Sequence, residues 1–113
     1  MREIKFRAWD KYGDSMVIDW YYSDWSINEY FSKSEFIVMQ YTGLKDKSGT
    51  EIYEGDVIQY KGMFVIEWDQ YFCRFHRKSL TIKSNGIYQV FPLCEIEEKE
   101  VIGNIHSNPE LLK

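Results

Sequence analysis

Short runs of β-branched and aromatic residues, separated by turn-forming residues, recur along the chain and constrain its fold more than any other feature. The clearest case is Asn85-Gly86, which stands between Thr-Ile-Lys-Ser and Ile-Tyr-Gln-Val. An Asn-Gly pair flanked by such runs is the strongest short-range signal for a β-hairpin. Short strands at regular spacing predict a small closed or nearly closed barrel, SH3-like in shape. In the second half we expect strands at 57–60, 64–68, 72–75, 80–82, 87–91 and 101–105.

The first half of the chain predicts a hairpin region that packs against this barrel. Residues 3–9 alternate apolar and polar side chains, which is typical of a strand with one buried face. A charged turn with a glycine at 10–14 leads to a second strand at 16–22. The apolar run at 36–41 predicts another strand, while 24–31 suits one or two helical turns or an irregular loop. The expected fold class is therefore mainly β, with at most one or two short helices.

The length of the chain bounds its domain organisation. A chain of 113 residues is ordinarily one domain and can bury a core without disulfides. The closely spaced turns at 42–56 mark a seam within residues 1–113. This seam divides an N-terminal β region at about 1–50 from a small barrel at about 51–106. A cap-like Ser-Asn-Pro sequence then predicts a short terminal helix at 107–113.

Neither a targeting signal nor a membrane span is expected. Met1-Arg2-Glu3 leads directly into the first alternating strand rather than into the apolar segment of a signal peptide. No apolar run approaches the roughly 20 residues that a membrane-spanning helix needs. Cys73 and Cys94 are most simply free thiols in a reducing compartment. We therefore expect a cytoplasmic protein that does not act on membranes.

The charge of the chain is distributed unevenly. A net charge of −4 argues against a general electrostatic attraction to nucleic acid. Residues 61–90, however, carry a net charge of +3, which leaves −7 for the remainder. Within this part, 71–78 interleaves rings with cations, and small barrels bind single strands through such surfaces. The alternative is that this segment is a strand in which every second residue packs into the core and the cations on the other face are simply solvated. The candidate residues for binding a nucleic acid or another partner are Tyr71, Arg74, His76, Arg77 and Lys78.

Two pairs of carboxylates have a spacing that enzymes use. They are Glu54 with Asp56 and Glu67 with Asp69. On a strand, both members of a pair share a face, and paired carboxylates can then acquire separate pKa values. The sequence Glu54-Gly55-Asp56 is also typical of a tight turn, because Asp hydrogen-bonds to the local backbone and Gly adopts a positive φ. We favour the turn and keep a small carboxylate-dependent enzyme as an alternative, with no catalytic residue assigned.

The sequence does not predict a metal or cofactor site. The potential zinc ligands are Cys73, His76, Cys94 and His106. Only the first two have the close spacing of a zinc knuckle, and residues three apart on a strand point to opposite faces. The acidic run at 95–100 suggests mimicry of DNA as a further alternative, although such runs usually form a soluble edge that prevents sheet aggregation.

Three stretches of the chain resemble a known family. Residues 2–10 read REIKFRAWD, 39–56 read MQYTGLKDKSGTEIYEGD and 100–112 read EVIGNIHSNPELL. Together they resemble the YopX family of phage and prophage proteins. The resemblance runs from end to end, with its recognisable motifs outside 57–98, where a partner-specific surface is therefore expected. It implies a small, mainly β protein encoded by a bacteriophage and acting in the bacterial cytoplasm, and it carries over no catalytic residue.

The resemblance leaves the role of its motif residues open. With no catalytic arrangement in the chain, we expect a non-enzymatic binding or interaction module whose partner is a protein of the host or the phage. A single-stranded nucleic acid is the alternative partner, and exposed aromatic residues also suit a homo-oligomer interface. The motif residues are Arg7, Trp9, Asp10, Tyr41, Thr42, Gly43, Asp46, Gly49, Tyr53, Glu54, Gly55 and Asp56.

Overall fold

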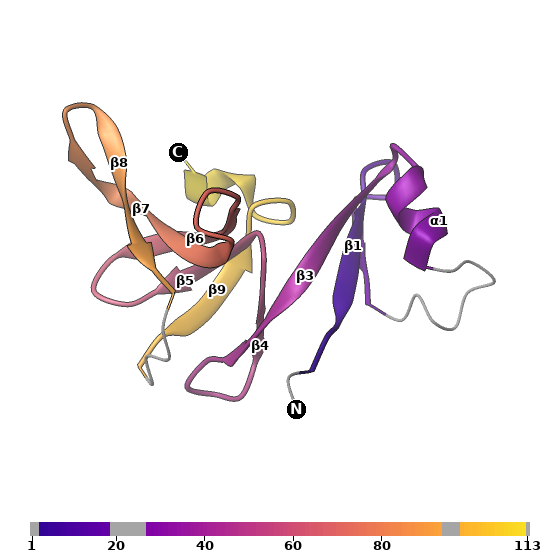
Figure 1. Ribbon diagram of the computed structural model, residues 1–113, viewed down its shortest axis with the longest axis horizontal. Helices are drawn as coiled ribbons and strands as arrows, with labels where there is room; N and C mark the ends of the chain where they lie inside the picture. Colours follow the sequence, from indigo (N-terminus) through magenta and orange to yellow (C-terminus); the bar gives the residue numbers. More distant parts are fainter. Residues whose placement is uncertain (1–2, 19–26, 94–97, 113) are drawn as a thin grey trace.

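The structure is a computed structural model that describes residues 3–18, 27–93 and 98–112. Two antiparallel sheets make up most of it, so the prediction of a mainly β fold is confirmed (Figure 1). The first sheet has the strand order β2-β1-β3-β4. Its strands are β1 (Phe6–Asp10), β2 (Ser15–Val17), β3 (Phe36–Lys45) and β4 (Glu51–Tyr53).

The helix α1 (Ile27–Ser32) covers part of this first sheet. The Tyr30 ring meets the Phe36 ring edge-on at 4.9 Å, and the Phe31 ring meets the Phe6 ring at 5.8 Å. These two ring contacts attach α1 to β1 and to the start of β3. The helical turns expected near 24–31 are thus confirmed for the described part. Residues 19–26, which include the end of the expected second strand, lie outside the described residues.

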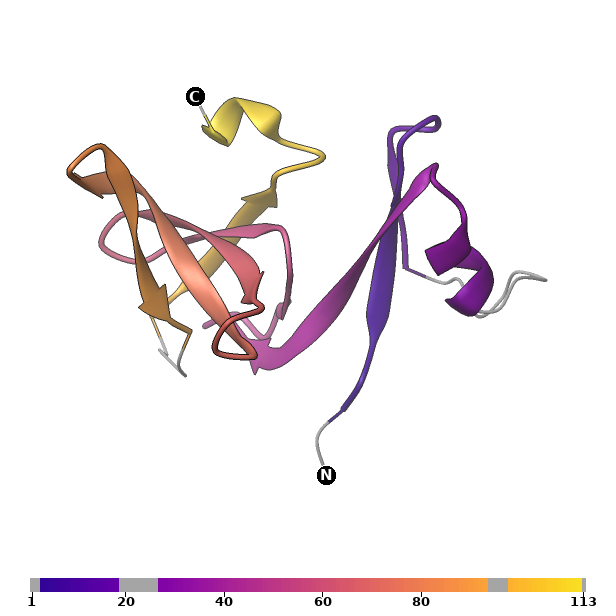
Figure 2. The same ribbon diagram turned by 45° about the horizontal axis from the view of Figure 1, so that its top comes forward.

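The second sheet has the strand order β8-β7-β6-β5-β9 and curls into a partial barrel (Figure 2). A 3-10 helix, η2 (Pro109–Leu112), follows its last strand where a short terminal helix is expected. None of the described helices has the length and apolar character needed to cross a membrane. The strands are β5 (Asp56–Gln59), β6 (Met63–Asp69), β7 (Arg74–Ser84), β8 (Ile87–Pro92) and β9 (Glu100–Asn104).

The hydrophobic core lies on the inner side of the curled sheet. Ile52, Ile58, Phe64 and Ile66 are at most 4% exposed, and partly buried apolar residues pack around them. Ile52 belongs to β4 of the first sheet. Burying apolar surface contributes about 25 cal/mol per Å². Because β4 supplies part of this core, the two sheets stabilise each other.

The hairpin at Asn85-Gly86 forms as expected. Its two residues have φ angles of 53° and 79°, and Ser84 pairs with Ile87 across the turn. Two positive φ angles in a two-residue loop define a type I′ turn, which Asn and Gly accept readily. These two residues therefore determine where the chain reverses direction between β7 and β8.

Two expectations about individual strands are wrong. The strands expected at 72–75 and 80–82 are one long strand, β7, because nothing between Arg74 and Ser84 breaks it and a register irregularity absorbs the bend. Phe72 lies in the turn before it. The first strand also does not have a single buried face. Arg7, Ala8 and Trp9 are all at most 9% exposed, because both faces of β1 are covered.

Candidate functional site

The motif residues Arg7 and Asp56 form a buried ion pair between the two sheets. The Arg7 guanidinium donates to Asp56 Oδ1 at 2.7 Å, and the two side chains are 10% and 2% exposed. The guanidinium also donates to the Glu54 carbonyl at 3.3 Å and lies 4.6 Å from the centre of the Tyr53 ring. Asp56 Oδ2 accepts the Tyr53 backbone N–H at 2.8 Å. Arg7 therefore connects β1 to the turn that begins the second sheet.

The carboxylates of Glu54 and Asp56 serve this local structure. Glu54 Oε1 accepts the backbone N–H of Gln40 at 2.8 Å. Burial raises the pKa of Asp56, while the Arg7 guanidinium and the Tyr53 amide act in the opposite direction. Both carboxylates are thus bound to backbone amides, and Asp56 is nearly inaccessible. The alternative of a carboxylate enzyme at this turn loses its geometric basis.

His106, from the third motif stretch, lies beside the Arg7–Asp56 ion pair and contacts Trp9. Its imidazole stacks on the Trp9 ring at 5.7 Å, and the Ile105 N–H donates to the Gly55 carbonyl at 2.9 Å. Gly55 has a φ of 84°, and a Cβ there would lie 3.1 Å from Met39 Sδ. Burial, with the nearby Arg7 charge, lowers the pKa of His106. We call Arg7, Trp9, Tyr53, Asp56 and His106 the central junction.

Asp46 connects the central motif loop to β9. Its Oδ1 accepts the N–H groups of Ser48 and Thr50, both at 2.9 Å, and its Oδ2 accepts the Val101 N–H at 3.0 Å. Burial alone would raise the pKa of Asp46, but these backbone hydrogen bonds lower it overall. The Asp46 carboxylate is fully used by the fold and is not available as a ligand or base.

The remaining motif residues shape turns and strand pairing. Asp10 Oδ1 accepts the N–H groups that follow it in the β1–β2 turn. Thr42 Oγ1 donates to the Ile52 carbonyl at 2.8 Å, which fastens β3 to β4. Gly43 and Gly49 have φ angles of 89° and 85°, a region that favours glycine. These residues therefore have structural roles that account for their place in the motif.

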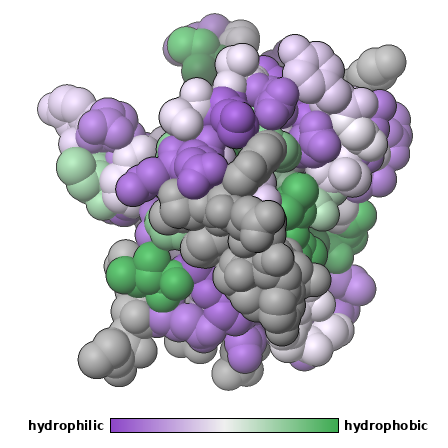
Figure 3. Space-filling model, turned by 90° about the vertical axis from the view of Figure 1, so that its right-hand side faces the viewer, coloured by the Kyte–Doolittle hydropathy of each residue, from purple (hydrophilic) through white to green (hydrophobic). Residues whose placement is uncertain are grey.

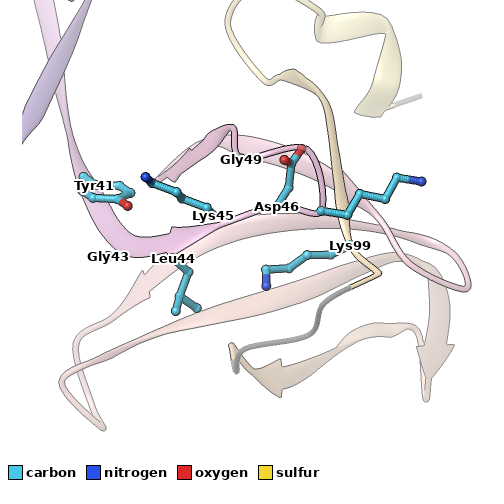
Figure 4. Close-up of a pocket in the computed structure, with 8 residues that line it drawn as sticks. Tyr41, Gly43, Leu44, Lys45, Asp46, Gly49 and Lys99 are labelled. Carbon is cyan, nitrogen blue, oxygen red and sulfur yellow. The ribbon is translucent and has the colours of Figure 1, made fainter.

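A surface hollow of about 680 Å³ lies over the central motif loop. Tyr41, Leu44, Asp46 and three lysines line it among others (Figure 4). The Lys45 nitrogen lies beside Tyr41, whereas the Lys99 side chain points toward Leu44 (Figure 4). The ammonium group of the third lysine, Lys47, lies 3.4 Å from Glu100 Oε2.

Two side chains of the predicted basic segment, His76 and Lys78, contact acids across the β6–β7 hairpin. His76 Nε2 lies 2.8 Å from Glu67 Oε1, and Lys78 Nζ lies 3.2 Å from Glu67 Oε2. Burial would raise the pKa of Glu67, but the contacts with His76 and Lys78 lower it overall. His76 Nδ1 also lies 3.5 Å from Asp69 Oδ2. The carboxylates Glu67 and Asp69 therefore offset positive charge on this face instead of forming a catalytic pair.

The other candidate cations lie apart from these two. The Arg77 guanidinium is on the inner face, 4.5 Å from the Phe64 ring centre and 5.1 Å from that of Phe91. Arg74 lies 4.7 Å from the Phe72 ring centre on the turn, beside Tyr71, which is 86% exposed. The five predicted binding residues thus occupy three environments, and Tyr71 and Arg74 are the most exposed of them.

The potential zinc ligands do not gather in the described part of the chain. No group of three His, Cys, Asp or Glu side chains there has the geometry of a metal site. Cys73 is an exposed free thiol, and His106 lies at the central junction. Cys94, like the acidic residues 95–97, lies outside the described residues.

An apolar cleft that the sequence did not predict lies between the two halves of the molecule. We define the apolar cleft by Phe6, Phe31, Val38 and Trp68, which line a pocket of about 210 Å³ together with two polar residues. Phe31 is 57% exposed and Trp68 is 41% exposed. Hydrophobic groups interrupt the hydrophilic surface on the face that carries α1 (Figure 3). Only their apolar character signals these residues in the sequence, and that signal equally indicates core.

Comparisons with known proteins identify the family. A search of curated proteins found no significant match. The family model described as YopX protein matches residues 18–113. The chain belongs to the YopX family. A crystal structure of protein EF1440 from Enterococcus faecalis is similar over 100% of both chains, with 28% sequence identity and a TM-score of 0.57.

The motif residues of this YopX protein and its most exposed aromatic residues come from different parts of the sequence. The stretches that carry the family resemblance build the central junction and the Asp46 loop. Trp68, Tyr71 and Phe72 come instead from 57–98, which lies between the stretches that carry the resemblance but within the part that the family model matches. The apolar cleft combines both parts of the chain, because Phe6 and Glu54 from the resemblance stretches line it together with Trp68.

Proposed function

We propose that this YopX protein is a non-enzymatic interaction module that binds a protein partner through the apolar cleft. The observation that carries this proposal is the set of accessible apolar side chains, Phe31 and Trp68 above all, lining a formed pocket between the two sheets. Interfaces are enriched in such aromatic residues at their centres. The module acts in the bacterial cytoplasm as the product of a phage or prophage.

The cleft is already organised for binding. The Trp68 indole N–H donates to Gln70 Oε1 at 3.0 Å, and its ring packs edge-on against Phe75 at 5.1 Å. The Phe31 ring is held by its contact with Phe6. Because these side chains are fixed before binding, a partner loses little additional conformational entropy when it docks.

The charges near the cleft favour a protein over a nucleic acid. Glu67 pairs with Lys78 and contacts His76, and Glu54 borders the pocket itself. Nucleic-acid affinity depends mainly on cations that face phosphates. An apolar cleft bordered by a carboxylate instead suits a protein segment with an apolar side chain and a neighbouring donor.

The proposal is tested by affinity capture from bacterial cells that carry the phage or prophage, with quantitative identification of both proteins and nucleic acids. Three baits are compared: the wild-type protein, Trp68→Ala and Tyr12→Ala. Tyr12 is 82% exposed in the β1–β2 turn and provides a matched aromatic control away from the cleft. We expect a protein that binds to the wild type and Tyr12→Ala and is lost with Trp68→Ala. A partner retained equally by all three baits contradicts a role of the cleft.

A second candidate function rests on the β6–β7 turn. Tyr71 and Phe72 are 86% and 60% exposed, and Arg74 has no ion pair with the described residues. Bases of a single strand stack on such rings while an arginine contacts the phosphate. Fluorescence anisotropy with labelled oligonucleotides tests this: binding should weaken with salt and with Arg74→Ala. No binding by the intact protein at low salt rules it out.

A further inference from the structure

The second sheet has one edge that the molecule covers and one that it leaves open. At the β9 edge, Asp46 Oδ2 accepts the Val101 N–H at 3.0 Å, and the Lys99 carbonyl accepts the Lys47 N–H at 3.0 Å. Further along, Asn108 Oδ1 accepts the Asn104 N–H at 3.2 Å. Proteins commonly cover sheet edges in this way, because uncovered edges pair with other chains.

The β8 edge has no such cover in the described part of the chain, where no hydrogen bond reaches its outer side. Its six residues, Ile87–Pro92, include no charged side chain. Ile87 is 72% exposed and Val90 is 49% exposed. An uncharged edge strand with exposed apolar residues is the form of edge that accepts another strand.

The backbone groups of β8 alternate between β7 and the open side. The Leu93 N–H points toward β7, since it donates to the Phe75 carbonyl, and Ile87 faces Ser84 across the type I′ turn. In an antiparallel ladder every second residue directs its N–H and C=O the same way. Odd-numbered residues from 87 to 93 therefore face β7, and Tyr88 and Val90 present their backbone groups outward.

We propose that β8 pairs antiparallel with β8 of a second copy of the chain, about a two-fold axis through Gln89. This register places Tyr88 opposite Val90 of the other copy, so that both outward-facing residues exchange their backbone hydrogen bonds. A shift by one residue would oppose an outward residue to an inward one. The pairing joins the two curled sheets into one continuous sheet.

The side chains of β8 are self-complementary in this register. Tyr88 and Val90 form an aromatic and β-branched cross-strand pair, and Ile87 lies opposite Phe91 on the other face. Such pairs stabilise antiparallel strands, and no like charges meet because the strand has none. The two-fold repetition of one patch is the geometry of most homodimers. This interface is separate from the apolar cleft, since Trp68 lies on β6 and β7 lies between β6 and β8.

The test is the mass in solution, measured by size exclusion with light scattering over a wide range of protein concentration. The wild type is expected at twice 13.6 kDa. Gln89→Lys and Gln89→Glu each place two like charges across the axis and should reduce the mass to that of one chain. An equal mixture of the two variants should restore the dimer, because each lysine then meets a glutamate.

A backbone variant and a surface control complete this experiment. Val90→Pro removes an outward N–H that no group in the described chain accepts, and edge strands tolerate proline. It should therefore give a single-chain mass with an unchanged circular dichroism spectrum. Tyr12→Lys, in the distant β1–β2 turn, should leave the dimer intact. The proposal is overturned if the wild type stays monomeric, or if both single Gln89 variants still form the dimer. If Val90→Pro does not fold, the result of mixing the two Gln89 variants decides.

Discussion

At the scale of single residues, the central junction explains why this fold contains charged groups in its interior. A buried charge is costly unless an opposite charge and hydrogen bonds satisfy it. Arg7 and Asp56 do this for each other, although 49 positions separate them in the sequence. The family resemblance singles out both residues, but nothing in the local sequence shows that they meet. Their pairing is therefore visible only in the folded chain.

The first prediction concerns this ion pair. Arg7→Met removes the cation and leaves the Asp56 carboxylate buried without its partner, so the free energy of unfolding should fall by about 3–5 kcal/mol. Urea unfolding followed by circular dichroism measures the change. Lys5→Met is the matched control, because Lys5 also pairs with acids but lies at the surface. Exposed ion pairs contribute little to stability. Equal losses in the two variants would contradict the assigned role of Arg7.

The second prediction concerns the pH dependence of stability. Because burial lowers the pKa of His106 below its ordinary value of 6.5, the unfolded chain takes up a proton more readily than the folded one. The contribution of this residue is therefore present above 6.5 and is lost as the pH falls through the folded pKa. His106→Phe keeps an aromatic ring against Trp9 but cannot titrate. Its unfolding free energy should fall less steeply with acidification, and an identical slope in both proteins would show that His106 does not contribute.

At the scale of elements, predictions succeeded where a local signal determines the backbone. The type I′ turn at Asn85-Gly86 and the tight turn at Glu54-Gly55-Asp56 follow from residues that accept those conformations. The start of β7 at Arg74 was not predicted, because Cys73 adopts a φ of 53° that its residue type does not favour. Asp69 accepts the N–H groups of Tyr71 and Phe72 and so stabilises a turn where alternation suggested a strand.

The third prediction concerns the attachment of the motif loop to β9. Asp46→Ala leaves three backbone N–H groups without their acceptor, and each buried unsatisfied donor costs about 1–3 kcal/mol. We expect reduced stability and faster amide hydrogen exchange at Ser48, Thr50 and Val101. Asp46→Asn, which keeps one acceptor oxygen, should lie between the wild type and Asp46→Ala. Unchanged exchange at Val101 would contradict the connection to β9.

At the scale of the whole molecule, the apolar cleft depends on how the two sheets are placed. Phe6, Phe31 and Trp68 come from different elements, and only the tertiary arrangement leaves them at a shared opening. Sequence reasoning assigns large apolar residues to the core, so it does not reveal such a surface. The composition of 71–78 predicted a binding segment, but the sequence does not show that Glu67 on the neighbouring strand contacts Lys78 and His76.

The most direct test of the central claim is hydrogen–deuterium exchange of the protein with and without the partner captured on the wild-type bait. Because the claim is that the partner occupies the apolar cleft, binding should slow exchange in α1 and at the end of β6 around Trp68. The same partner should give no slowing with Trp68→Ala. Protection confined to the hollow over the central motif loop, or to the outer edge of β8, would contradict the claim and place the binding surface elsewhere.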